Sequence, residues 1–450
     1  MRMDVSFVLG VICALFADAS AAAPPFSPRP CPDKTPELRC GTVTVPENRD
    51  HPQGRTIDLN VVIVQARNAR TGAPPLFHVD GGPGIAATDA AAFYLGPGSL
   101  YRQDRDVVLF DQRGTGGSNP LRCPALEHRG PLQAMYSRNE INACIRDLKK
   151  RADLTQYSTE NSADDIDRVR EALGYPSIDI WALSYGTFLA QEYLKRYPER
   201  VHRVVLVGFV PLDYRAPLYH AANGQRVLDL VLYECQFDET CRTKYPDLRG
   251  DWRSLLRSLG ERRGPIMEAL RSSLGTAAAQ RRTPFLIHAA AHGNLQLLLE
   301  SFPKDSSRFA EGLNLSIVCS EAVSRIDPAD VPGATSGTFV GDYRVRQDMA
   351  ACENWPRHRV RDGFYDPLKT SPPILVIAGE MDNVAAPEWG YRFCSVLSEC
   401  RFALIPNLGH GPFDLDAWTN GACFDEIAAG FFRDGLDTSC LKRMQPPPFK

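Results

Sequence analysis

The chain reads SIDIWALSYGTFLAQEYLKRY at residues 177–197, and this stretch decides the fold. Apolar residues alternate with polar or bulky ones up to Ala182, which predicts a buried strand. Beyond Ser184 they recur at helical spacing until Pro198. Strand, sharp turn and helix are the setting of the nucleophile elbow, G-x-S-x-G, in which alanine is the least disruptive replacement for the first glycine. The alternative is a chance Ser-x-Gly at a strand end, so the rest of the chain must decide between these two interpretations.

Length and composition are those of an ordinary globular protein. The chain has 450 residues, of which 44% are hydrophobic and 23% are charged, enough for one large domain or two to three smaller ones. The formal net charge of -3 argues against a nucleic-acid partner. No Lys/Arg-rich run suggests a membrane-surface site.

The N-terminus has the pattern of a targeting segment. An apolar run at residues 5–16 is followed by small residues at 17–23. We therefore predict a signal peptide at residues 1–23 and export to a periplasmic or extracellular location. Ile12 argues against a lipid anchor on Cys13, because such a site needs a small residue before the cysteine. No second apolar run reaches transmembrane length, so we expect no stable membrane anchor.

Cysteine usage agrees with an oxidising compartment. The sequence has 13 cysteines, and an even number remains once Cys13 leaves with the signal peptide. No C-x-x-C occurs, so we expect no zinc or other metal site. Because short loops close cheaply, we predict that sequence neighbours pair. The predicted disulfides are Cys31–Cys40, Cys123–Cys144, Cys235–Cys241, Cys319–Cys352, Cys394–Cys400 and Cys423–Cys440.

Strand patterns alternate with helical ones along most of the chain. This alternation predicts an α/β fold with a mostly parallel central sheet and helices on both faces. One helix is expected to begin at an N-cap, Ser162, and to run to Leu173. The expected strands lie at residues 42–45, 57–65, 76–79, 106–110, 178–182, 201–210, 372–379 and 401–406.

The pattern changes in the middle of the chain. From residue 216 to 369 the periodicity is helical or irregular. We expect this segment to form an inserted, mainly helical cap. It would separate a first core part at residues 24–215 from a second core part at residues 370–450.

Several expected strands end in residues that can carry chemistry. In parallel sheets the carboxyl ends of the strands meet at one edge. Ser184, Asp382 and His410 each follow such a strand, and their chain order is that of the α/β-hydrolases. A serine hydroxyl needs a base, and the base needs an orienting acid, so we predict that these three form a catalytic triad. Of nine histidines, His78 is the only rival near these loops.

Two glycine-rich loops lie beside this group. The GGPG run leaves the N–H groups of Gly81 and Gly82 unshielded, which suits an oxyanion hole completed by the Tyr185 N–H. An ordinary turn is the alternative interpretation of GGPG alone. In the second loop, Asp111 and Arg113 are expected to form an ion pair that braces the loops.

Five motifs occur together: GGPG at 81–84, DQRGTGGS at 111–118, ALSYG at 182–186, GEMD at 379–382 and GHG at 409–411. In these residues the chain resembles the prolyl iminopeptidase and tripeptidyl aminopeptidase family of α/β-hydrolases. Asp80 departs from the iminopeptidase pattern, in which a histidine directly precedes the two glycines. The segments that begin at Cys319 and Cys352 look more like the secreted tripeptidyl branch. The resemblance implies hydrolysis at the amino end of peptides, without a cofactor.

We therefore expect a secreted serine exopeptidase that acts on peptides. A free α-amine is cationic near neutral pH, so its pocket should offer a partly desolvated carboxylate. Glu321, next to the predicted Cys319–Cys352 bridge, is the leading candidate for this amine anchor, and Glu353 is the second. Solvated surface acids are the simpler interpretation of either glutamate. Two alternatives stay open: an esterase or other small-molecule acyl hydrolase, and a non-catalytic binding protein on the same fold.

Overall fold

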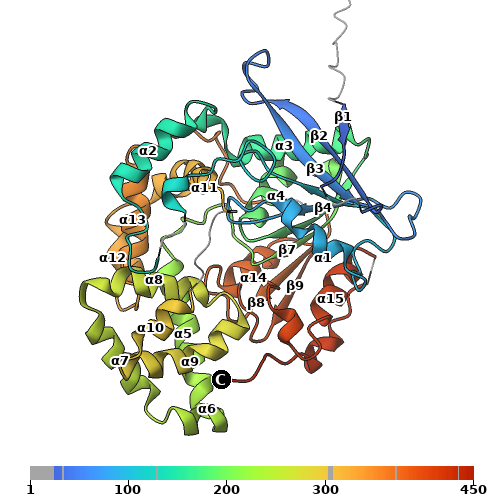
Figure 1. Cartoon of the computed structure of the whole chain (residues 1–450). Coiled ribbons are helices and arrows are strands. Elements are labelled where there is room, and N and C mark those ends of the chain that lie inside the picture. The colour runs from blue at the N-terminus through green and yellow to red at the C-terminus, as the bar shows by residue number, and fades with distance from the viewer. Residues whose placement is uncertain (1–24, 33–34, 128–129, 303–307, 370–371, 434) are drawn as a thin grey trace, which may run out of the picture.

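The computed structural model describes residues 25–32, 35–127, 130–302, 308–369, 372–433 and 435–450 (Figure 1). The predicted signal peptide, with Cys13, lies outside these residues. No helix in the described part of the chain is long and apolar enough to cross a membrane.

One nine-stranded sheet organises the described chain, in the order β1-β2-β3-β5-β4-β6-β7-β8-β9. Neighbouring strands pair antiparallel from β1 to β5 and parallel from β5 to β9. The predicted, mostly parallel sheet is therefore confirmed. The strands are β1 (Phe26–Arg29), β2 (Leu38–Pro46), β3 (Thr56–Val64), β4 (Leu76–Val79), β5 (Val107–Phe110), β6 (Ile178–Leu183), β7 (Val201–Val207), β8 (Ile374–Gly379) and β9 (Cys400–Ile405).

Helices cover both faces of this sheet (Figure 1). Alternate residues of β6 point to opposite faces, and all six are buried. Ile180 packs in one core with α3, α4 and residues of α14, whereas Trp181 packs in another with α1 and α15. The helices around the sheet are α1 (Ala91–Leu95), α2 (Arg138–Leu148), α3 (Thr159–Ala172), α4 (Tyr185–Arg196), α14 (Pro387–Ser395) and α15 (Cys423–Phe431).

Helix α3 begins earlier than the sequence predicts. Its N-cap is Ser158, whose side chain accepts a hydrogen bond from the Asn161 N–H, and Ser162 is buried inside the helix. Both serines fit the N-cap pattern. A tertiary contact favours Ser158 as the N-cap. Glu321, from a distant segment, accepts a hydrogen bond at 2.9 Å from the N–H of Thr159, the first residue of the helix. The prediction of Ser162 as the N-cap was therefore wrong.

The described chain between β7 and β8 is helical and packs in two parts. Helices α5 to α10, at the lower left of Figure 1, gather around an apolar cluster of their own. Most apolar residues at 310–368 instead join the core that α3 and α4 share with the sheet. These helices are α5 (His220–Phe237), α6 (Glu239–Lys244), α7 (Leu248–Leu259), α8 (Arg263–Ser273), α9 (Ala277–Ala291), α10 (Leu295–Glu300), α11 (Glu311–Ile317), α12 (Asp330–Thr335) and α13 (Tyr343–Cys352).

Six disulfides link the described residues, in the same neighbouring pairs that the sequence suggests. They are Cys31–Cys40, Cys123–Cys144, Cys235–Cys241, Cys319–Cys352, Cys394–Cys400 and Cys423–Cys440. Cys319–Cys352 joins the π-helical turn Val318–Ala322 to the end of α13. Several bridges in one chain are consistent with an oxidising compartment outside the cytosol.

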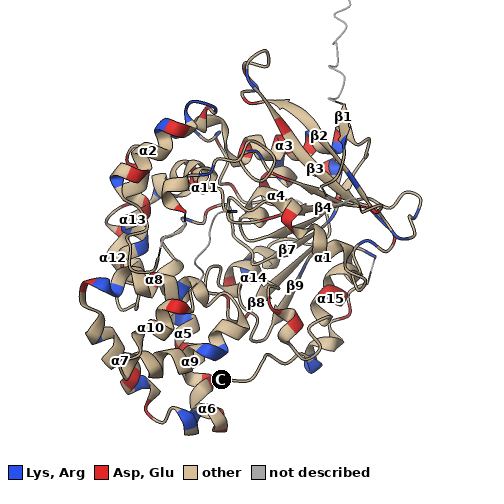
Figure 2. Ribbon diagram, in the orientation of Figure 1, with Lys and Arg blue, Asp and Glu red and all other residues tan. Residues whose placement is uncertain are grey.

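Charged side chains of both signs are interspersed along the elements in Figure 2. The ion pair between Arg113 and Asp165 is fully buried. Arg113 Nε donates to Asp165 Oδ2 at 2.6 Å, and Arg113 Nη2 donates to Oδ1 at 2.8 Å. Asp111 instead accepts N–H groups of Thr88 at 3.0 Å and Gly117 at 2.8 Å. The predicted Asp111–Arg113 ion pair is wrong, because α3 presents Asp165 to the guanidinium.

Asp165→Asn is expected to destabilise the fold by about 3–5 kcal/mol, since it leaves a buried guanidinium without its carboxylate. Glu171→Gln is the control on the same helix, because Glu171 is only half-buried and pairs with Arg168 at 2.7 Å and more distantly with Arg170 at 3.5 Å. Losing that pair should cost less than about 1 kcal/mol. Urea unfolding of both purified variants measures the difference, and equal losses of stability would contradict a special role for the buried pair.

Candidate active site

Ser184 lies at the turn between β6 and α4. Its backbone has φ 55° and ψ -124°, which residues other than glycine rarely adopt. The Ser184 N–H donates to Val207 O at 2.9 Å, so the neighbouring strand β7 holds the turn. Gly186 has no room for a side chain, since an added Cβ would lie 2.2 Å from Val79 O. Packing against β4 and β7 thus maintains the strained serine.

The three predicted triad residues form one hydrogen-bonded chain. Ser184 Oγ lies 2.8 Å from His410 Nε2, and His410 Nδ1 lies 2.8 Å from Asp382 Oδ2. Asp382 is fully buried, and its Oδ1 accepts the N–H groups of Val384 at 2.7 Å and Ala385 at 2.8 Å. This fixed carboxylate favours a proton on Nδ1, which leaves Nε2 free to accept the serine proton.

Strand order explains how the three residues meet. Asp382 follows β8 and His410 follows β9, and both strands run parallel to β6 with their carboxyl ends at the same edge. The His410 N–H also donates to Gly275 O at 2.9 Å. The turn between α8 and α9 therefore holds the histidine loop from the helical side.

The loop after β4 carries the predicted oxyanion donors. Gly81 lies against Ser184, since an added Cβ would be 2.9 Å from Ser184 Cβ. Its N–H already donates to Asp80 Oδ1 at 2.6 Å, whereas the Gly82 N–H has no acceptor in the described chain. The Tyr185 N–H lies in the first turn of α4, where N–H groups have no intrahelical acceptor. Gly82 and Tyr185 are thus better placed than Gly81 to donate to an oxyanion.

His78, the rival histidine, is engaged beneath this loop. It stacks on Trp181 with ring centroids 4.8 Å apart, and its Nδ1 lies 2.8 Å from the Tyr94 hydroxyl. Its Nε2 lies 3.2 Å from Asp80 Oδ2. Burial by itself would raise the pKa of Asp80. The hydrogen bond and charge of His78, with the Gly81 N–H, outweigh burial and hold this pKa below its ordinary value. His78 therefore supports the loop and does not contact Ser184.

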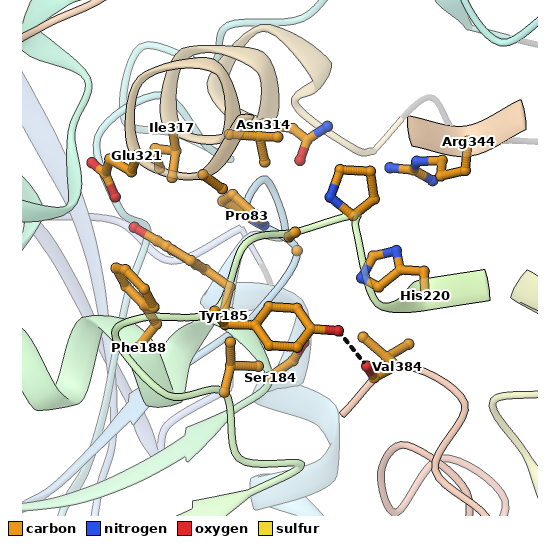
Figure 3. A pocket seen from close by; sticks show the side chains of 17 residues that line it. Pro83, Ser184, Tyr185, Phe188, His220, Asn314, Ile317, Glu321, Arg344 and Val384 are labelled. Carbon is orange, nitrogen blue, oxygen red and sulfur yellow. Dashed lines mark hydrogen bonds between the residues drawn. The ribbon is translucent and has the colours of Figure 1, made fainter. Parts of the chain in front are cut away.

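A cavity of about 110 Å³, the Ser184 cavity, opens beside the nucleophile (Figure 3). Glu321 and Arg344 lie on opposite sides of it in this view, and the Tyr185 ring lies between Ser184 and Glu321. Most of the remaining wall is apolar. The residues that line it are Gly82, Pro83, Ser184, Tyr185, Phe188, Val210, Tyr214, Ala216, Pro217, His220, Asn314, Ile317, Val318, Glu321, Ala322, Arg344 and Val384.

Glu321 reaches this cavity from the π-helical turn Val318–Ala322. Its side chain is buried, Oε1 accepts the Thr159 N–H at 2.9 Å, and Oε2 accepts the Thr159 hydroxyl at 2.6 Å. Thr159 Oγ1 also lies 2.9 Å from the Tyr185 hydroxyl. Glu321 therefore holds the first turn of α3 as well as lining the cavity, a structural role that the sequence did not suggest.

Glu353 lies outside the Ser184 cavity. Its side chain is 55% exposed, and Oε2 accepts a hydrogen bond from Arg138 Nη2 at 2.9 Å. The prediction of Glu353 as a second amine anchor was therefore wrong. Its neighbour Cys352 is tied to the cavity wall by a disulfide, but the glutamate side chain itself remains at the surface.

Sequence reasoning missed several polar residues of the cavity. His220, Asn314 and Arg344 come from α5, α11 and α13, and no motif links them. Burial, with the charges of Arg271 and Arg344, holds the pKa of His220 well below its ordinary value, so its imidazole is neutral. Only the tertiary packing of three helices brings these side chains to Ser184.

One group of side chains in the described ranges could hold a metal ion. Potential ligand atoms of Asp251, His288 and His292 lie within 4.8 Å of one another. Asp251 Oδ2 already lies 2.7 Å from His288 Nδ1. None of the three lines the Ser184 cavity.

Comparisons with known proteins agree with this fold. The alpha/beta hydrolase fold family matches residues 74–417. The putative hydrolase YuaR of Escherichia coli (strain K12) is 26% identical over 223 residues, which cover 46% of this chain and 44% of that protein. The tripeptidyl aminopeptidase of Streptomyces lividans is 30% identical over 211 residues, 41% of this chain and 38% of that protein. The proline iminopeptidase of Aeromonas sobria is 32% identical over 165 residues, 35% of this chain and 33% of that protein.

Each of these alignments spans less than half of the relative's length. The relatives include both kinds of aminopeptidase that the motifs resemble. The family match itself extends from before β4 to beyond His410, so it includes every triad residue. Because that match covers more than half of the chain, the chain belongs to the alpha/beta hydrolase fold family.

Proposed function

We propose that this chain is an exported serine exopeptidase, which releases residues or short peptides from the free N-terminus of a peptide. The observation that carries the proposal is the hydrogen-bonded chain from Asp382 through His410 to Ser184, which opens on a cavity that also holds the Glu321 carboxylate. Likeness to aminopeptidases and the six disulfides support it.

In this mechanism Ser184 attacks the scissile carbonyl while His410 Nε2 takes its proton. The N–H groups of Tyr185 and Gly82 stabilise the oxyanion as the C–O bond forms. His410 then gives the proton to the leaving nitrogen, the C–N bond breaks, and an acyl-enzyme remains for water to hydrolyse. Asp382 holds the imidazole orientation throughout.

The Ser184 cavity would hold the acyl side of the substrate. Phe188, Val210 and Tyr214 offer an apolar wall for a side chain next to the scissile bond. Glu321 would attract the cationic α-amine, and such charge-assisted bonds are strongest in a desolvated place. π-helical turns often occur at functional sites, and Glu321 lies in one.

One observation favours an esterase or another acyl hydrolase as the second candidate. Both oxygens of Glu321 already accept hydrogen bonds from Thr159, and Oε1 also lies 3.2 Å from His358 Nε2. A carboxylate has about four lone-pair sites, so an amine can still bind, but the same contacts suit a purely structural acid. An esterase would need the same triad and oxyanion donors without an amine anchor.

Ser184→Ala and His410→Ala should each lower kcat for aminoacyl amides by on the order of 10³-fold or more, because each removes part of the proton relay. Ser254→Ala, on the exposed face of α7, is the matched control and should leave turnover unchanged. Circular dichroism checks that each variant is folded. Near wild-type turnover in folded Ser184→Ala would refute the triad.

Glu321→Gln should raise KM for substrates with a free α-amine much more than for uncharged esters of the same acyl group. The neutral amide can still accept the Thr159 N–H but loses the attraction for a cation. N-acetylation of the substrate should abolish most activity of the wild-type enzyme. Glu353→Gln, which changes an exposed acid, is the control and should leave both KM values unchanged.

Equal KM increases for amines and esters would assign Glu321 a structural role only. Cleavage of N-acetylated peptides as fast as free ones would contradict an exopeptidase and favour the esterase. Thermal unfolding of Glu321→Gln measures its contribution to the start of α3 separately, so stability and substrate binding are not confused.

A further inference from the structure

A second cavity, of about 640 Å³, is lined by sequence neighbours of residues that line the Ser184 cavity. The loop after β4 contributes Gly82 and Pro83 to the Ser184 cavity, and Asp80 and Ile85 to the second one. Leu183, which directly precedes the nucleophile, also lines the second cavity. Residues of α1 and α15 complete it, and both helices lie on the same side of the sheet in Figure 1. We call it the α1–α15 cavity.

The α1–α15 cavity lies beside the histidine loop. Pro412 and Phe413, which follow His410 along the chain, form part of its wall. During acyl transfer the histidine gives its proton to the leaving nitrogen, so the leaving group must lie on the imidazole side of the scissile bond. With the acyl part in the Ser184 cavity, the leaving part therefore extends toward the α1–α15 cavity.

The wall of this cavity combines acids with aromatic rings. The acids are Asp80, Asp416 and Asp425, and the aromatic residues include Phe93, Trp181 and Phe413. Phe93 is 51% exposed and Phe413 is 57% exposed, so both rings are accessible at the surface. Neither lysine nor arginine occurs among the described residues that line it. Carboxylates and aromatic faces together attract organic cations.

Asp425 has the clearest capacity for a ligand. Its Oδ1 accepts the Tyr101 hydroxyl at 2.8 Å, and no described residue donates a hydrogen bond to its Oδ2. Burial, despite the Tyr101 hydroxyl, raises the pKa of Asp425 to about 6. A cation bound nearby would favour the charged form of this carboxylate.

We propose that the α1–α15 cavity binds the leaving side of the substrate and selects a basic residue directly after the scissile bond. This inference rests on the proposed exopeptidase function, for which it specifies the substrate class. The acids supply the charge preference, and the aromatic rings pack along the aliphatic part of a lysine or arginine side chain.

The test uses peptides that share one N-terminal acyl part and differ only in the next residue, which is Lys, Ala or Glu. The wild-type enzyme should cleave the Lys peptide with kcat/KM about tenfold above that of the Glu peptide, equivalent to about 1.4 kcal/mol. A neutral anilide with the same acyl part reports the chemistry without a charged leaving residue.

Asp425→Asn and Asp416→Asn should each reduce the Lys-to-Glu ratio while leaving kcat/KM for the anilide unchanged. Asp416 is exposed, so its variant keeps the test valid if Asp425→Asn fails to fold. Glu426→Gln is the matched control, because Glu426 is exposed on the same helix as Asp425 and does not line the cavity. It should leave the ratio at the wild-type value.

The outcomes separate this inference from the function on which it rests. Cleavage of the anilide and all three peptides at similar rates would overturn the inference and leave the exopeptidase intact. A Lys preference that is unchanged by both aspartate substitutions would also overturn the inference, since groups other than these aspartates would then recognise the charge. If neither the anilide nor any peptide is cleaved, the proposed function is wrong and the inference falls with it.

Discussion

The contact between Gly186 and the carbonyl of Val79 is the constraint on which the active-site geometry depends. An added Cβ at Gly186 would lie 2.2 Å from that oxygen, so β4 and the start of α4 meet with no side chain between them. This approach holds Ser184 at φ 55° and brings the loop after β4 against it. Ser184, the proposed nucleophile, and Gly82, one of the two proposed oxyanion donors, therefore come from segments about a hundred residues apart and are held together by a contact that only glycine permits.

A second, polar link ties the nucleophile to the helical segment. The Tyr185 hydroxyl lies 2.9 Å from Thr159 Oγ1, which donates to Glu321 Oε2 at 2.6 Å. The residue after the serine, the first turn of α3 and the π-helical turn thus form one buried network. Such networks rigidify a core when every member is satisfied. Glu321 thus holds this network and also lines the Ser184 cavity, so the proposed amine anchor is at the same time a structural acid.

The two cavities distinguish two sides of the proposed active site. The loop after β4 and the end of β6 separate them, and Ser184 lies at this boundary. One side is closed by helices of the segment between β7 and β8, whereas the other is formed by α1, α15 and the histidine loop. The proposed acyl transfer would need different surroundings for the part of the substrate that is retained and the part that is released, and the two cavities differ in their lining.

Local pattern by itself determined every strand of the sheet except β1, and also the elbow and the order of Ser184, Asp382 and His410. The apolar pattern of a buried strand repeats over a few residues, and the carboxyl ends of parallel strands lie at the same edge of a sheet. Both features can therefore be predicted from the sequence alone. It also suggested the disulfide pairs, because neighbours in sequence are close in space. Packing between distant elements decided the rest. Arg113 binds Asp165 of α3 and not its neighbour Asp111, α3 starts at a contact with Glu321, and Glu353 lies at the surface. His220 and Arg344 reach the Ser184 cavity from separate helices. A side chain's partner across the core depends on three-dimensional packing, which no local spacing encodes.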